Sequence, residues 1–372
     1  MADAQITLSH SRGRGIVALA SGEKYESAGK ALVESGFQRG EAGVYRLPAE
    51  DPDVSRTTVA GLVRRAEAHG ATVTTSSRRF IGDTAEDLAR LLPGQWEAQV
   101  ELYSHPLWQE DLVPWLWDSG ELARAVQSER IPYAATLTLT DGASETTLLL
   151  AERPGHQLDY LVGAFSPVPF EESYGDPYAP ASIVLSSFPG RAARAITERY
   201  LPAFDRALHA RRTTAVADAL DRIRTEHRAW TAMVASGRYS DATPLSFDAL
   251  GTATAQFLDT TWREFLTVVD HAPAVLARCL PTATPWPEDA ETLAQLTHAL
   301  TDAEPVHEDL ARGTSLTSAE RNARMWPAVE TWLACGESFL RQARAATPHP
   351  RPVLTATATP RALPSARPAP RR

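Results

Sequence analysis

Hydrophobic and polar positions follow three different patterns along this chain, and they predict three folded regions. In residues 1–96, short runs with a two-residue period alternate with helical stretches. Residues 97–188 contain further strand-like runs and a hairpin signal, whereas residues 189–346 keep a helical period throughout. The predicted fold is therefore α+β in the N-terminal and middle regions, with small antiparallel or mixed sheets and helices, followed by an all-α helical bundle.

The first region is predicted to be a small β-β-α-β-α-β module. Gly36 and Gly70 each follow a helical pattern, where glycine commonly ends a helix. A further helix is expected at 83–92, with Asp83 and Glu86 as a capping box. The module's strands are expected at 6–10, 15–20, 43–47 and 71–76, and its helices at 23–35 and 55–69.

The middle region carries a hairpin signal. Strand-like runs at 133–140 and 145–152 are joined by Asp-Gly-Ala-Ser, a typical turn sequence. Two further strands are expected at 158–165 and 182–187. The loop 166–181 between them has four prolines, and loops of this length inside a domain are usually functional or disordered.

The region 189–346 is predicted to form an antiparallel bundle of four helices joined by short loops. Its last helix opens with the capping-box pattern Thr317-x-x-Glu320, and Pro327 is expected to kink or divide it. Residues 347–372 have seven prolines and five arginines and no acidic residue, which predicts a disordered tail.

Charge is spread unevenly between these regions. The chain carries a net charge of -9, yet residues 1–96 are neutral overall and residues 97–211 carry -8. An acidic body disfavours nucleic-acid binding by the protein as a whole, because phosphate contacts dominate that affinity. Only residues 1–96 and the tail can supply a basic face.

Two basic turns in the first region are the leading candidate for a binding site. Glycines beside Arg12 and Arg14 let backbone N–H groups approach a ligand while guanidiniums flank it, an arrangement that suits phosphate. Arg78 and Arg79 follow a predicted strand, and Lys30 lies on the first helix. We predict a nucleic-acid contact through these five residues if the two turns share one face. The alternative is a pair of solvated turns with ordinary surface arginines.

Two aromatic clusters offer weaker candidates. Trp108, Trp115 and Trp117 are interleaved with acidic residues, which favours packing in the core or at a domain junction. The loop 166–181 contains Phe170, Tyr174 and Tyr178, which could bind a protein partner. It also contains Glu171, Glu172 and Asp176, whose carboxylates raise the alternative of a metal or acid–base site.

The N-terminal stretch resembles a short module at the start of uncharacterised actinobacterial proteins, many of them encoded near plasmid or integrative-element genes. The resemblance is carried by Ile6-Thr7-Leu8-Ser9-His10-Ser11, Gly36-Phe37 and Gly43-Val44-Tyr45-Arg46-Leu47-Pro48. It covers under a quarter of the chain. It implies a link to a mobile element and no particular activity.

The sequence contains none of the common catalytic or cofactor-binding motifs, so it gives no support to an enzyme, although it does not exclude one. The chain has no P-loop, dinucleotide fingerprint, His-Glu-x-x-His or Gly-x-Ser-x-Gly pattern, so no catalytic residue, metal or cofactor is predicted. It also has no apolar run long enough to span a membrane and no signal-peptide pattern, and it has only two cysteines; a cytoplasmic location is expected.

We therefore expect a non-enzymatic cytoplasmic binding protein, with nucleic acid as the candidate ligand of residues 1–96. One alternative is an interaction or assembly protein that binds a partner or forms a homo-oligomer through residues 189–346. A second is a metal-dependent hydrolase that uses the acidic loop.

Overall fold

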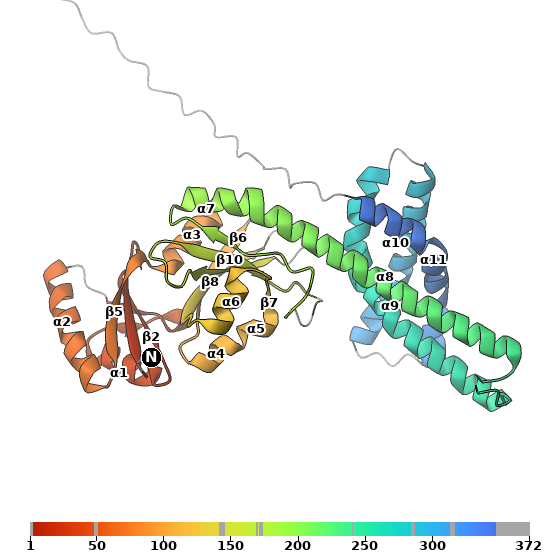
Figure 1. The fold of residues 1–372 in the computed structure, drawn as a ribbon, viewed down its shortest axis with the longest axis horizontal. Coiled ribbons are helices and arrows are strands. Elements are labelled where there is room, and N and C mark those ends of the chain that lie inside the picture. The colour runs from red at the N-terminus through yellow and green to blue at the C-terminus, as the bar shows by residue number, and fades with distance from the viewer. Residues whose placement is uncertain are drawn as a thin grey trace, which may run out of the picture.

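The computed structural model describes residues 3–47, 51–140, 146–168, 170, 174–239, 241–283, 287–312 and 317–346. These residues form two sheets and a bundle of helices (Figure 1). The strands are β1 (Gln5–Ser11), β2 (Gly15–Ser21), β3 (Gln38–Arg39), β4 (Tyr45–Leu47), β5 (Thr72–Arg79), β6 (Trp96–Leu102), β7 (Leu116–Trp117), β8 (Tyr133–Leu139), β9 (Thr147–Glu152), β10 (Tyr160–Phe165) and β11 (Ile183–Leu185). The helices are α1 (Tyr25–Glu34), η1 (Glu41–Gly43), α2 (Pro52–Ala68), α3 (Ile81–Leu91), α4 (Pro106–Glu110), α5 (Leu112–Trp115), α6 (Glu121–Ser128), α7 (Pro189–Ala195), η2 (Ile196–Tyr200), α8 (Leu201–Ser236), α9 (Phe247–Ala283), α10 (Pro287–Ala311) and α11 (Ser318–Ala345).

The N-terminal sheet has the strand order β3-β4-β2-β1-β5, with β5 parallel to β1 and the other pairs antiparallel. Side chains alternate between its two faces. On β2, Ala18 and Ala20 pack in the core shared with α1 and α2, whereas Val17 and Leu19 face the second core, which is built around the other sheet. The central strand β2 is therefore buried on both faces, and its second face contributes to the junction with the middle region.

The second sheet has the order β11-β10-β9-β8-β6, and β7 pairs with β10. Its central strands are hydrophobic at nearly every position because helices cover both faces. On β9, Leu148 and Leu150 pack in the core that includes α3, α7 and the start of α8. Leu149 and Ala151 pack in the smaller core on the opposite face, with α5 and α6.

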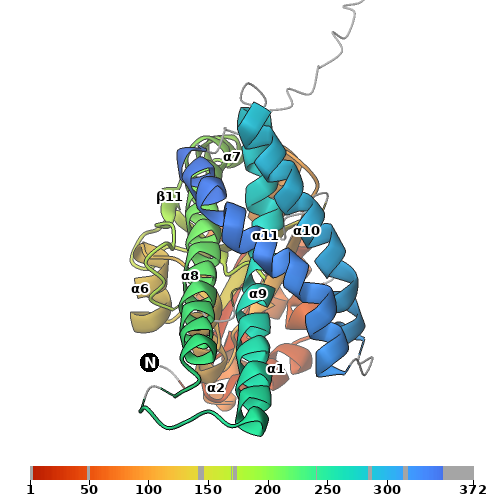
Figure 2. The same ribbon diagram turned by 90° about the vertical axis from the view of Figure 1, so that its right-hand side faces the viewer.

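The helical bundle is joined to this sheet by α8, which has 36 residues (Figures 1 and 2). Leu201 and Phe204 at its start belong to the core of the middle region. From Val216 onward the same helix packs in the bundle core with α9 and α11. One continuous helix therefore belongs to two hydrophobic cores.

The fold class predicted from the sequence is confirmed, as are the β8–β9 hairpin and the capping box of Thr317 with Glu320. The short strands β3 and β7 and the strand β6 were not predicted. Pro327 does not divide the last helix, because α11 continues through it. The predicted tail 347–372 lies outside the described residues.

The predicted capping box at Asp83 and Glu86 is wrong. α3 begins two residues earlier, at Ile81, with no side-chain cap, and Asp83 is buried inside its first turn. Its carboxylate binds the β1–β2 turn instead of the helix's own backbone. α3 also contributes Ile81 and Leu88 to the core of the middle region, although the sequence placed it within 1–96.

Candidate anion-binding groove

The turn between β1 and β2 is held against α3 by hydrogen bonds. Ser11 Oγ donates to Asp83 Oδ1 over 2.8 Å, and the backbone N–H of Arg12 donates to Asp83 Oδ2 over 2.6 Å. The Arg12 guanidinium pairs with Asp87 at 2.7 Å, and this contact raises the pKa of Arg12. The backbone donor and the guanidinium that were predicted to approach a ligand therefore bind the protein's own helix.

Arg78 also binds within the protein. Its side chain is 9% exposed and forms an ion pair with Glu152 at 2.5 Å. It further donates to the backbone carbonyls of Arg153 and Gln157 and lies 5.8 Å from the centre of the Tyr160 ring. Arg78 thus connects β5 to the β9–β10 loop and is withdrawn from solvent.

The two basic turns lie at the same end of the N-terminal sheet, because His10 on β1 is the register partner of Arg79 on parallel β5. The Arg79 side chain is exposed and forms no hydrogen bond or ion pair with the described residues. Lys30 is exposed on α1 and lines a different cavity from Arg14. The five predicted residues therefore do not form one surface.

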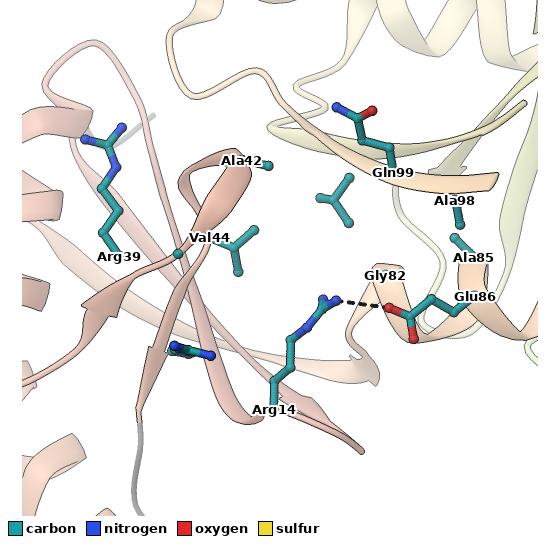
Figure 3. Close-up of a pocket in the computed structure, with 12 residues that line it drawn as sticks. Arg14, Arg39, Ala42, Val44, Gly82, Ala85, Glu86, Ala98 and Gln99 are labelled. Carbon is teal, nitrogen blue, oxygen red and sulfur yellow. Dashed lines mark hydrogen bonds and ion pairs between the residues drawn. The ribbon is translucent and has the colours of Figure 1, made fainter.

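A different set of arginines meets at a cavity of about 840 Å³ between the N-terminal sheet and the middle region (Figure 3). Arg14, Arg39 and Arg46 line it from the N-terminal side. The opposite wall is formed by α3 and β6, from Gly82, Ala85, Glu86, Ala98, Gln99 and Val100. A cavity of this size is within the range of small-molecule sites.

The local fold explains why Arg46 faces this cavity. Its neighbours on β4, Tyr45 and Leu47, are buried in the core with α1 and α2, so alternation along the strand turns Arg46 to the other face. There it pairs in register with Val17, a residue of the junction core. Arg39 precedes it on the short antiparallel strand β3.

Arg39 and Arg46 differ from Arg12 and Arg78 in their partners. Within the described ranges, neither forms an ion pair or a side-chain hydrogen bond. Arg14 pairs with Glu86 at 3.0 Å, as Figure 3 shows, and lies 5.7 Å from the centre of the Phe80 ring. Both members of the Arg14–Glu86 pair are about half exposed, at 45% and 48%, so water weakens their attraction. An anionic ligand could replace Glu86 at small cost.

Two backbone segments, at Gly82 and at Ala42, help to shape the wall of the cavity. A Cβ at Gly82 would lie 2.5 Å from the Phe80 ring and 3.1 Å from Val100, so a side chain cannot be added there without movement. In the loop that links β3 to β4, Ala42 has a φ of 55°, a left-handed conformation that costs a non-glycine residue about 1 kcal/mol. This loop borders the cavity.

The aromatic residues predicted to bind a partner mostly contact the protein itself. Phe170 is 8% exposed, stacks on His271 of α9 at 4.8 Å, and lies 4.9 Å below the Arg211 guanidinium. Tyr178 Oη lies 2.8 Å from Thr214 Oγ1 on α8. Tyr174 is 65% exposed and alone of the three is available to a partner.

The acidic residues of the same loop give no support to a metal site. Asp176 is held by Arg211 at 2.9 Å, whereas Glu171 and Glu172 lie outside the described residues. Across the described part of the chain, no three His, Cys, Asp or Glu residues are grouped so that they could hold a metal ion. The loop instead joins the middle region to the bundle.

The three tryptophans predicted to pack in the core or at a junction occupy three environments. Trp117 is fully buried in the core of the middle region, and Trp115 is 55% exposed. Trp108 is 43% exposed and packs on Tyr25 of α1 with ring centres 5.2 Å apart. Trp108 therefore lies at the junction between the N-terminal and middle regions.

The sequence indicated Arg14 but not Arg39 or Arg46. A usable signal was present, because Arg46 is the charged residue between two apolar ones in a predicted strand. Alternation places it opposite the core face. The sequence could not show that a second region covers this opposite face and turns it into a cavity wall.

A scan against protein-family models and searches of curated proteins and of solved structures found no match. The similarity to actinobacterial element proteins therefore remains a prediction. None of the helices in the described ranges is both long and apolar enough to cross a membrane.

Proposed function

We propose that this protein is a binding protein that takes a phosphate-bearing anion into the cavity lined by Arg14, Arg39 and Arg46. One observation carries the proposal: three arginines line one cavity, and two of them have no acidic partner in the described ranges. Guanidinium groups bind phosphate oxygens through paired hydrogen bonds.

The overall acidity of the chain supports a confined site over a broad basic surface. With a net charge of -9, long-range attraction would not draw a polyanion to the whole protein. A cleft that gathers three arginines creates a local positive potential within this acidic surface. The ligand should therefore be small, or present only one end to the cleft.

Calorimetric titration with inorganic triphosphate tests the proposal. The double variant R39A/R46A should reduce affinity at least tenfold, because it removes both guanidiniums that lack an acidic partner. The matched control R64A/R199A removes two exposed arginines outside the cavity, with the same change in net charge. Equal losses in the two double variants would show that only net charge matters and would refute the proposal.

The second candidate function is assembly of two copies through the bundle. The end of the α8–α9 hairpin exposes Phe247 at 89%, and Tyr239, which is 38% exposed, lines a cavity of about 730 Å³ with Trp230 and Phe257. Exposed apolar groups of this kind often mark contacts between proteins. Light scattering would then give twice the chain mass, and Phe247→Ser would return it to the mass of one chain.

A further inference from the structure

The arginine-lined cavity continues into a second cavity of about 740 Å³. Arg39, Ala42, Gln99 and Val100 line both, so the two form one groove along the junction of the N-terminal and middle regions. We call this the junction groove. Arg14 and Arg46 line its first half, Arg39 lines both halves, and the loop at Ala42 lies where the two halves meet.

The second half of the junction groove is aromatic. Tyr25 and Trp108 line it, and their rings are 5.2 Å apart and tilted by 60°. His105 completes the cluster, 6.3 Å from the Trp108 ring. Because Trp108 remains 43% exposed, part of its indole is open to a ligand. Exposed rings beside a basic cleft stack with the bases of nucleotides.

The polar residues of the second half differ from those of the first. Glu26, Glu34 and Glu101 line it together with Lys30 and Arg39, whereas Glu86 is the acidic residue among those that line the first half. Carboxylates accept hydrogen bonds from hydroxyl and amino groups and repel anions. The two halves therefore suit different chemical groups: the first binds an anion, and the second binds a flat ring with hydrogen-bond donors.

A ligand with only one kind of chemical group would suit only one half of the junction groove. Inorganic polyphosphate would occupy the arginine half and be repelled from the glutamates. An acidic peptide would meet the same repulsion, because its carboxylates recur along its length. A nucleoside phosphate carries its charge at one end and a ring with amino and hydroxyl groups at the other.

We infer that the ligand of the junction groove is a nucleoside phosphate, with its phosphates on Arg14, Arg39 and Arg46 and its base against Trp108. The inference rests on the proposed function and adds the class of ligand. The same chemistry can come from a free nucleotide or from the terminal nucleotide of a single strand.

The test compares ATP with inorganic triphosphate by calorimetry, on the full chain at low salt. Stacking of one base contributes about 1–3 kcal/mol, so ATP should bind about tenfold more tightly than triphosphate. Trp108→Leu should remove this advantage and leave triphosphate affinity unchanged. Trp108→Phe should restore part of the advantage, which a loss of folding in the leucine variant would not allow.

The matched control is Trp115→Leu, which removes an exposed tryptophan that lines neither half of the groove. It should leave both affinities unchanged. If ATP and triphosphate bind equally and Trp108→Leu changes neither, the inference is overturned while the proposed function stands. If neither ATP nor triphosphate binds, both the proposed function and this inference are overturned.

A 5′-phosphorylated octanucleotide distinguishes the two sources. Tighter binding than ATP, lost in R39A/R46A, would assign the groove to the end of a single strand. Weaker binding than ATP would assign it to a free nucleotide, because the flanking acidic surface would then repel the additional phosphates.

Discussion

Two junctions hold this molecule together, and among the described residues each contains arginines with an acidic partner and arginines without one. Between the middle region and α8, Arg211 binds Asp176 and covers Phe170, so the chain's own loop occupies the guanidinium. Between the N-terminal and middle regions, Arg78 is bound in the same way. Arg39 and Arg46 lie at that junction too, yet they face a cavity with no carboxylate bound to them in the described ranges. The residue type does not decide whether an arginine stabilises the fold or binds a ligand. An acidic partner alone does not decide it either: Arg212 on α8 has none among the described residues, yet its Nε is buried and burial lowers its pKa, whereas Arg39 and Arg46 are exposed and line a cavity.

The largest expected effect comes from removing an arginine that is bound. Arg78→Ala would leave Glu152 half-buried without its partner and three backbone carbonyls without their donor. Breaking such a buried pair costs about 4 kcal/mol of the free energy of unfolding. Urea unfolding measures this loss. A change in the free energy of unfolding below 1 kcal/mol would mean that the contacts of Arg78 contribute no more to stability than expected for Arg39, which has no acidic partner in the described ranges.

The junction at α8 should be sensitive to acid. Burial, then Arg212 and Arg211, lowers the pKa of His271 to about 4 from an ordinary 6.5, and burial also lowers the pKa of His209. The unfolded chain therefore takes up more protons than the folded one between these values, so stability falls as the pH drops from 6.5 towards 4.

The His271 contribution to that fall amounts to about 3 kcal/mol. Urea unfolding at pH 7 and pH 4.5 measures the total, and His271→Gln should reduce the difference. The same pH dependence in the variant and in the original chain would exclude His271 as its source.

An intermediate effect is expected at Asp83, which is 5% exposed and accepts hydrogen bonds from Ser11 Oγ and Arg12 N. Asp83→Ala leaves these buried donors without an acceptor and should cost about 2 kcal/mol. Asp87→Ala is the control, because it removes an acid that pairs only with exposed arginines and should cost less than half as much. If both variants lost the same free energy of unfolding, the loss would come from removing a negative charge from α3 and not from the hydrogen bonds of Asp83.

The two arginines whose removal should weaken ligand binding most should contribute least to the free energy of unfolding. Arg39→Ala and Arg46→Ala should each change the free energy of unfolding by less than about 0.5 kcal/mol, because they remove exposed side chains without partners in the described ranges. Thermal unfolding provides the measurement. A loss near that of Arg78→Ala would show that these arginines stabilise the junction and are not held for a ligand.

The sequence predicted the helices and strands better than it predicted which side chains contact each other. The hydrophobic pattern predicted both strands of the β8–β9 hairpin, because two strand-like runs flank a turn sequence there. It did not predict β3, which has two residues, too few to form a pattern. Asp83 was assigned to its own helix because local spacing favours capping, whereas the observed contact joins it to Ser11, 72 residues away.

The candidate site was harder to predict for the same reason. The Arg-Gly-Arg-Gly turn was identified by composition, yet Arg12 meets Asp87 only after the chain folds. Arg39 and Arg46 stand out because no acidic side chain in the described ranges pairs with them. A sequence does not show which residues will lack a partner after folding. Of the predicted residues, Arg14 and Lys30 line the junction groove, and they do so in different halves.

The continuous helix α8 has a mechanical consequence. Its 36 residues make a rod about 54 Å long, rooted in the middle region at one end and ending beyond the bundle core at the other. The ring stack of Phe170 and His271 lies beside it at Arg211. About 38 Å of the helix lies beyond Arg211, so a tilt of about 10° at that point would move the far end by about 7 Å. The displacement caused by a small change in packing at this junction would therefore be largest at the exposed aromatic residues where α8 ends.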